Sequence, residues 1–204
     1  MMKLDHIAVA AETLDEGRAY VEEALGVPLE QGGKHTKLGT HNMLLGLEDG
    51  VYFELIAIDP DAPDPGLRRW FNLDDFSGAP RLTNWICQTG DLTDALALAP
   101  EQMGSPIELT RGDLRWMMAA GIDGRLPFDQ GFPAIINWGD SPHPSTRLTP
   151  SGLRLERLVI TNPEAEALRQ ALSLLISDAR IVIEQGAVGM RAEFSSASGQ
   201  KVLG

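Results

Sequence analysis

The sequence predicts an α+β protein built from repeated β-α-β-β-β modules, the third of them compact. Three stretches of the chain each read as a short apolar strand, a helix cap and an amphipathic helix, and strand-like stretches follow each helix. The length of 204 residues suits one large domain or two small ones. We expect modules at residues 1–59, 81–139 and 153–204, with a Pro-rich connecting segment at 60–80 and a loop at 140–152.

The first module opens on an apolar strand at residues 4–10, and Thr13 stands where a helix N-cap belongs. Apolar residues recur at helical spacing up to Leu25, and Gly26 follows at the position where a glycine commonly ends a helix. Glu48-Asp49-Gly50 has the composition of a hairpin turn. The three strands after the helix are expected at residues 34–38, 42–47 and 51–58.

The second and third modules repeat this order. Residues 82–87 form the second opening strand, and Asp91 caps the helix that follows it. Residues 153–161 form the third opening strand, where Asn162 is the expected cap and Pro163 takes the first helical position. The later strands are expected at residues 107–110, 114–120 and 132–138 in the second module, and at 181–185, 190–195 and 201–203 in the third.

Composition and charge narrow the choice of partner to a small molecule or another protein. The net charge is −12, and so acidic a surface repels nucleic acid and anionic membranes. No apolar run approaches the ~20 residues of a membrane span, and residues 1–11 lack the apolar core of a signal peptide. The single cysteine, Cys87, excludes an internal disulfide and reads as an inert core thiol, so we expect a cytoplasmic protein.

The segment at residues 60–80 is more than a plain linker, because it carries three large aromatic residues among its prolines and aspartates. It either packs on the domain or covers a pocket. Exposing adjacent aromatic rings to water is unfavourable, so we expect Trp70 and Phe71 to be at least half buried.

A set of short motifs adds a family resemblance to this pattern. The motifs are Asp5-His6-Ile7, His35-Thr36-Lys37-Leu38-Gly39-Thr40-His41-Asn42, Tyr52-Phe53-Glu54-Leu55-Ile56, Pro133-Ala134-Ile135-Ile136-Asn137-Trp138 and His143-Pro144. With the tandem modules they resemble the vicinal oxygen chelate superfamily of glyoxalases, extradiol dioxygenases and bleomycin-resistance-type proteins, and within it the glyoxalase-like subgroup. The resemblance covers most of the chain. It implies a curved mixed sheet around a cavity, where the first and fourth strands of two modules hold a divalent metal.

Strand parity tests the first half of that implied site. Side chains alternate between the faces of a strand, so His6 lies opposite Ile7, and Glu54 lies opposite Phe53 and Leu55. The apolar residues suit a helix-packed face, which leaves His6 and Glu54 to point together into the cavity, within about 5 Å of each other. Both are suitable ligands for iron, zinc, manganese or nickel. The alternative is a hydrogen-bonded His6–Glu54 pair without a metal.

The second module departs from the superfamily where two further ligands are needed. The position that matches His6 falls on Asn84 or Trp85, and the position that matches Glu54 falls near Ile136 or Asn137. Indole and aliphatic side chains do not bind metals, and a neutral amide is a poor ligand for these ions. The other histidines from which a third ligand would have to come are His35, His41 and His143.

Further polar and aromatic residues are placed to line the cavity and bind a ligand. Large aromatic residues are also ordinary core residues, and a histidine more often serves as a hydrogen-bonding group than as a ligand. The candidates for substrate binding are His35, Asn42, Tyr52, Trp85, Trp138 and His143.

Two classes of function remain open. In the first, the protein is an enzyme of lyase, isomerase or dioxygenase type with an incomplete metal site, and Glu54 is the catalytic proton acceptor. In the second, the same cavity sequesters a small, partly apolar molecule without turning it over. No Gly-rich phosphate loop is present, so no nucleotide cofactor is expected.

The third module predicts a homodimer. Superfamily modules work in pairs, so the resemblance leaves residues 153–204 without a mate in the same chain. That module either packs beside the first two or meets its counterpart in a second chain across a two-fold axis, and we favour the dimer.

Overall fold

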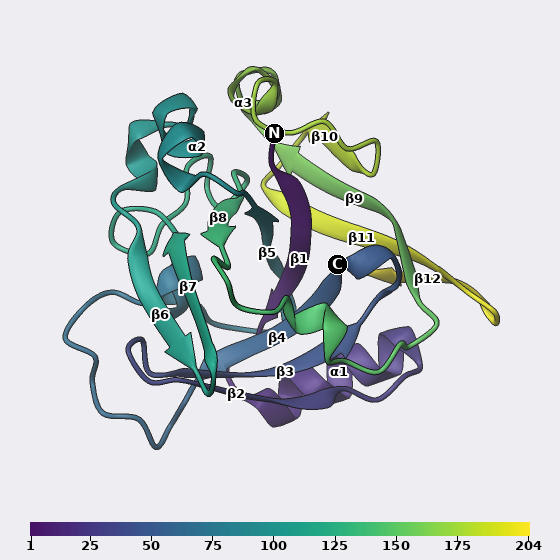
Figure 1. Cartoon of the computed structure of the whole chain (residues 1–204). Coiled ribbons are helices and arrows are strands. Elements are labelled where there is room, and N and C mark those ends of the chain that lie inside the picture. Colours follow the sequence, from purple (N-terminus) through teal and green to yellow (C-terminus); the bar gives the residue numbers. More distant parts are fainter.

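The computed structural model describes all 204 residues and has the α+β fold that the sequence predicts. The order β-α-β-β-β occurs three times along the chain (Figure 1). The strands form an eight-stranded sheet of order β2-β3-β4-β1-β5-β8-β7-β6 and a four-stranded sheet of order β10-β9-β11-β12. No helix has the length and apolar composition that crossing a membrane requires.

The first unit forms one half of the large sheet. Thr13 caps its helix by accepting from the Glu16 amide, and Gly26 ends it with a φ of 74°, as predicted. The strand expected at 34–38 is wrong: the amides of Leu38 and Gly39 both donate to the His35 carbonyl, so residues 36–39 turn and the strand lies earlier. The elements are β1 (Lys3–Ala10), α1 (Leu14–Leu25), β2 (Glu30–His35), β3 (Thr40–Gly46) and β4 (Tyr52–Ile58).

The second unit forms the other half, and β5 joins the halves by pairing antiparallel with β1. Asp91 caps the helix by accepting from the Asp94 amide, as predicted. The far strands β2 and β6 also contact each other, so the sheet curves almost into a closed barrel (Figure 1). The elements are β5 (Arg81–Gln88), α2 (Leu92–Leu98), β6 (Ile107–Arg111), β7 (Leu114–Ala119) and β8 (Ala134–Asn137).

The third unit carries the small sheet. The cap predicted at Asn162 is wrong, because Asn162 closes a turn by accepting from the Glu164 amide and the helix begins two residues later than a cap at Asn162 would allow. Strand β11 packs on β5 and β12 packs against α1, so this unit lies beside the first two in the same chain. The elements are β9 (Arg154–Asn162), α3 (Ala165–Leu172), β10 (Ile181–Gln185), β11 (Gly189–Ser196) and β12 (Gly199–Leu203).

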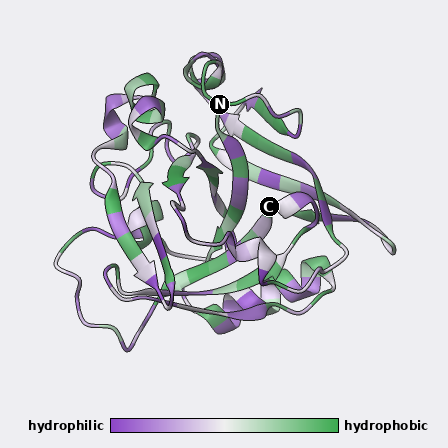
Figure 2. Ribbon diagram, in the orientation of Figure 1, coloured by the Kyte–Doolittle hydropathy of each residue, from purple (hydrophilic) through white to green (hydrophobic).

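One apolar core runs through all three units. A single cluster of 51 buried residues includes Ile7 of the first unit, Cys87 of the second and Phe194 of the third, which explains why the units pack as one body. Figure 2 shows hydrophilic and hydrophobic residues alternating along α1, whose apolar stripe faces the sheet. Burial raises the pKa of the Cys87 thiol well above its usual value, as suits an inert core residue.

Candidate functional site

A β-bulge places two consecutive residues of β1 on the same side of the sheet. In the ladder with β5, Leu4 pairs with Cys87 and His6 pairs with Ile86, which leaves Asp5 as the extra residue. The Asp5 and His6 side chains meet there, with 2.6 Å between Asp5 Oδ1 and His6 Nδ1. The bulge therefore supplies His6 with a carboxylate that simple strand alternation would have turned away.

His6 and Glu54 lie together as strand parity predicts. His6 Nε2 is 3.4 Å from Glu54 Oε2, and both side chains are almost fully buried. The Asn42 amide donates to Glu54 Oε1 over 2.6 Å and accepts from the Gly33 amide. Asn42 on β3 therefore fixes the orientation of the Glu54 carboxylate through this hydrogen bond.

Asp5, His6 and Glu54 form a chain of opposite charges. Burial alone would raise the pKa of Glu54, but the hydrogen bond and charge of His6 lower it to about 2. Burial opposes ionisation of Asp5 as well, and His143 and His6 lower its pKa to about 2. Burial acts to lower the pKa of His6, yet Asp5 and Glu54 raise it above its usual value. Two carboxylates thus flank one imidazole ring and favour its protonated form.

The loop after β8 completes the surroundings of Asp5. Trp138 Nε1 donates to Asp5 Oδ2 over 2.9 Å, and His143 Nε2 lies 3.0 Å from the same oxygen. His143 Nδ1 accepts from the Ser145 amide, so its proton sits on Nε2 and donates to Asp5. His143 is therefore a neighbour of the carboxylate behind His6, whereas Trp138 also lines the cavity.

The cavity lies between the two halves of the large sheet. The first half of the sheet contributes four of the residues that line the cavity. The second half contributes several others, and Arg111 is one of them. The space that the centre of a water-sized sphere can reach is about 20 Å³, roughly enough for one small polar group. The polar and aromatic residues that the sequence suggested and that line it are His6, His35, Tyr52, Glu54 and Trp138.

The expectation that Trp85 lines the cavity is wrong. Trp85 pairs with Ile7 in the β1–β5 ladder and so lies on the face away from His6. Its indole N–H donates to the Gly131 carbonyl over 2.9 Å, and its side chain is fully buried in the core. The register between β1 and β5 decides this placement. The bulge in β1 shifts that register, so Trp85 lies beside Ile7 rather than beside His6.

The second half supplies no metal ligand opposite His6 and Glu54. The residue of β5 that pairs with His6 is Ile86, so the prediction that Asn84 or Trp85 matches His6 is wrong. On β8, the residue that faces the cavity is Ile136. The structure contains no group of three or more histidine, cysteine or acidic side chains suited to a metal ion. Two donors and an arginine in the same cavity do not fit a resident divalent metal.

The other histidines do not complete such a site. His35 Nδ1 lies 3.0 Å from Thr40 Oγ1 and its Nε2 lies 3.3 Å from the Arg111 guanidinium. Burial lowers the pKa of His35 to about 4, so the ring is neutral. His41 is half-buried and outside the cavity wall.

The Pro-rich segment closes the cavity with its aromatic pair, as the sequence allows. Trp70 and Phe71 are 4% and 2% exposed, which confirms the predicted burial. They belong to a kinked 3-10 segment, η2 (Trp70–Asp75), in which Phe71 and Asn72 adopt left-handed φ angles. The Trp70 ring stands edge-on to His35, with 4.9 Å between centroids.

The remaining single-turn 3-10 segments are η1 (Glu48–Gly50), η3 (Glu101–Met103) and η4 (Pro144–Thr146).

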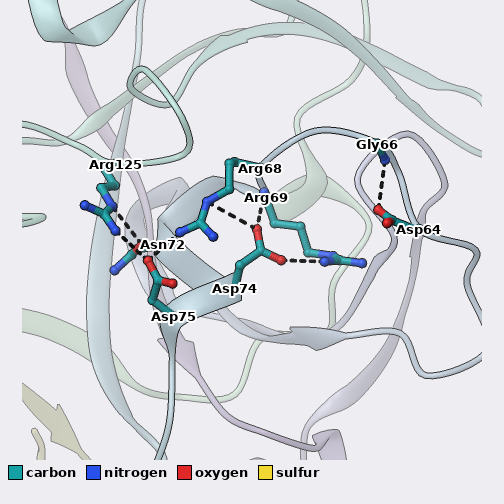
Figure 3. Close-up of polar contacts among 8 residues, drawn as sticks. All are labelled: Asp64, Gly66, Arg68, Arg69, Asn72, Asp74, Asp75 and Arg125. Atoms are coloured by element: carbon teal, nitrogen blue, oxygen red, sulfur yellow. Dashed lines mark hydrogen bonds and ion pairs between the residues drawn. The ribbon is translucent and has the colours of Figure 1, made fainter.

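Ion pairs hold this segment in place (Figure 3). Asp75 lies 2.6 Å from the Arg125 guanidinium, and Arg125 also donates to Asn72 over 3.3 Å. Arg125 follows Gly124, where a Cβ would lie 1.8 Å from the Arg69 carbonyl, so only glycine permits the close approach of the two loops. We define the contacts of Arg125 with Asp75 and Asn72 as the latch.

Sequence reasoning missed two polar residues of the site. Asp5 lies next to His6, but alternation places it on the wrong face unless a bulge is known. Arg111 is the last residue of β6, and nothing in the neighbouring sequence indicates that it reaches His35 of the other half. In both cases the sequence offered one indication of a site residue, which was a charged side chain in or at the end of a largely apolar strand.

Comparisons with known proteins agree with this architecture. A hypothetical protein from Staphylococcus aureus has a similar structure, with a TM-score of 0.65, 18% identity and coverage of 93% of this chain and 88% of that one. Methylmalonyl-CoA epimerase from Mycobacterium tuberculosis gives 0.43 at 19% identity over 68% of this chain and 88% of that one, too distant to support an argument. No curated protein matches the sequence significantly.

The sequence also matches a protein family over most of its length. A family model described as "Glyoxalase-like domain" matches residues 4–176, which include the two halves of the large sheet and the start of the third unit. The chain therefore belongs to the glyoxalase-like domain family of the vicinal oxygen chelate superfamily.

Proposed function

We propose that the protein is a lyase- or isomerase-type enzyme that moves a proton on a small ligand in the cavity. Glu54 is the proton acceptor and His6 is the proton donor. The observation that carries the proposal is the pairing of a buried carboxylate with a buried imidazole ring, 3.4 Å apart, on the wall of an aromatic cavity. Such a pair supplies a base and an acid side by side.

The chemistry balances without any further reactant. Glu54 takes a proton from a carbon next to a carbonyl group, and the electron pair of that C–H bond moves onto the carbonyl oxygen. His6 gives its Nε2 proton to that oxygen, and Asp5 holds the ring in place. Glu54 then returns a proton to carbon while the oxygen gives its proton back to His6 and the carbonyl reforms, which completes an isomerisation or an exchange. The aromatic walls exclude water and strengthen these interactions.

A divalent metal has no defined part in this proposal. His6 Nε2 and Glu54 are the two groups that would bind iron, zinc, manganese or nickel, and Asp5 would hold His6 as carboxylates often do behind a ligating histidine. The aliphatic Ile86 and Ile136 stand where further ligands would be needed. We therefore route no step through a metal, and dioxygenase chemistry is the least supported of the three classes.

The second candidate function is sequestration of a small molecule. The observation that favours it is the state of Glu54, whose oxygens are both engaged and whose pKa is lowered to about 2, which makes it a weak base. Under this alternative the ligand binds without a proton leaving carbon.

Proton exchange in D₂O separates the two functions. The probes are pyruvate and phenylpyruvate, and NMR follows deuterium entering the carbon next to the carbonyl. We expect exchange faster than in buffer alone, lost in Glu54→Gln and kept in Glu101→Gln, an exposed control. No exchange above the buffer rate, or exchange that survives Glu54→Gln in a folded protein, would contradict the enzyme. Ligand-dependent stabilisation without exchange would support sequestration.

A further inference from the structure

Arg111 brings a positive charge to the cavity and pairs with no acidic side chain. It is half-buried at the end of β6, and its one polar contact is with His35 Nε2, 3.3 Å away. Its guanidinium also lies 5.9 Å from the centre of the Trp116 ring. An arginine carries five N–H donors in a planar fork that matches a carboxylate, and most of these have no protein acceptor here.

Neighbouring residues position Arg111 without neutralising it. Arg111 only donates, so His35 Nε2 accepts and the ring proton on Nδ1 donates to Thr40 Oγ1. His35 is therefore an uncharged support. Gly33 leaves room for the arginine stem, because a Cβ there would lie 2.8 Å from Arg111 Cδ. This packing joins β2 to β6 and aims the guanidinium across the gap between the two halves.

Two further donors in the cavity wall lack acceptors. The indole N–H groups of Trp70 and Trp116 are buried and have no hydrogen-bond partner, although both residues line the cavity. An unpartnered buried N–H is costly, so it marks a place where an acceptor is expected. The acidic groups nearby are already engaged: Glu54 by Asn42 and His6, and Asp5 by His6, Trp138 and His143.

The rest of the cavity wall is apolar. Phe71, Met118 and Ile136 supply it, and they cannot bind a polar body. The reachable space of about 20 Å³ is too small for a whole ligand, so entry requires the segment at 60–80 to shift. Arg111 and Trp116 belong to β6 and β7 of the second half and are not part of that segment.

We propose that Arg111, with the indole N–H group of Trp116, forms a carboxylate-binding subsite, so that the ligand is a small carboxylic acid with an apolar body. This inference rests on the proposed function in one respect: it places the acid next to Glu54, so that Arg111 holds the carboxylate while the neighbouring carbon meets the base. The positive charge that faces a ligand carboxylate at this point is that of Arg111, which pairs with no acidic side chain.

Matched acids and amides test the subsite. Binding of acetate and benzoate is measured by calorimetry beside acetamide and benzamide, which have nearly the same shape and no charge. We expect the wild-type protein to prefer each acid at least about tenfold, as bonds to a charged partner usually give. Arg111→Gln should lose that preference and leave the amides unchanged. Trp116→Phe should weaken the acids a few-fold, and Arg115→Gln, an exposed control on β7, should match the wild type.

The outcomes separate this inference from the proposed function. If neither acid binds better than its amide, or if a folded Arg111→Gln keeps the preference, the subsite is overturned. Binding of acids that depends on Arg111, with no exchange of carbon-bound protons in D₂O, sustains the subsite and contradicts the proton-transfer enzyme. Proton exchange that depends on Glu54, with no preference for acids over amides, sustains the proton-transfer enzyme and contradicts the subsite. Arg111→Lys should bind acids with intermediate affinity, because it keeps the charge and loses the fork.

Discussion

Asp5 and His6 are consecutive residues whose side chains lie on the same side of the sheet, with 2.6 Å between Asp5 Oδ1 and His6 Nδ1. The bulge in β1 causes this, and it makes Asp5 the meeting point of His6, Trp138 and His143. The position of His6 is therefore set by a carboxylate that also ties β1 to the loop after β8. Site geometry and local stability depend on the same residue.

Asp5→Asn should loosen this arrangement. The change keeps the shape of the side chain but removes the charge that raises the pKa of His6, so NMR titration should show a lower pKa for His6. Denaturant unfolding should show a loss of about 1–3 kcal/mol, as expected when a buried polar group loses its partner. Asp113→Asn is the control, because Asp113 is exposed and pairs with Arg147. Unchanged stability together with an unchanged His6 pKa would refute the role of Asp5.

Stability should fall as the pH is lowered from 6.5 to 4 because of His35. Its pKa is about 4 in the folded protein against an ordinary 6.5, so in this window the unfolded chain binds a proton that the folded protein does not. The full gap corresponds to roughly 3 kcal/mol. His6 acts oppositely at higher pH: its pKa is raised, so its contribution is complete below pH 6.5 and is lost as the pH rises through the folded value.

The variant His35→Gln isolates this effect, since a glutamine side chain still accepts from Arg111 and does not titrate. Unfolding free energies of the variant and the wild type are measured from pH 8 to pH 4. The difference between the two curves should change between pH 6.5 and 4 and stay constant above it. Parallel curves would show that His35 is not the group responsible.

The latch should control how often the segment at 60–80 opens. Arg125→Ala removes the contacts with Asp75 and Asn72, so amide hydrogen exchange of residues 70–75 should rise about two- to fivefold, as exposed ion pairs contribute little each. Arg147→Ala removes a similar exposed pair with Asp113 elsewhere and should leave that exchange unchanged. Equal exchange in both variants would mean that the buried Trp70 and Phe71 hold the segment without the latch.

Treatment with a chelator should leave the protein intact. Two donors make a weak divalent site, so dialysis against EDTA should change neither the melting temperature nor any proton-exchange activity. Metal analysis of the protein before and after dialysis is the measurement. Stoichiometric iron, zinc, manganese or nickel that disappears in His6→Ala would show that the donor set is sufficient after all.

The homodimer stays a prediction. The third unit packs within the chain, yet β10 is an edge strand of the small sheet and pairs only with β9, so its outer edge is free to pair with another chain. Light scattering at micromolar concentration should give about twice the monomer mass of 22.1 kDa. A mass equal to the monomer would contradict it.

The sequence by itself determined the modules and the first half of the site. The caps at Thr13 and Asp91 and the end at Gly26 depend on neighbouring residues alone, so local chemistry was enough to place them. His6 and Glu54 were paired correctly because alternation along a strand is also a local rule, and it needed only the assumption that β1 and β4 share a sheet.

Only the tertiary structure decided the rest of the site. The bulge at Asp5 depends on how β1 meets β5, and the same register turns Trp85 into the core. Arg111 reaches His35 across 76 positions of sequence because the large sheet curves until β2 meets β6. Register and curvature arise from the packing of many distant side chains at once, so no window of the sequence contains them.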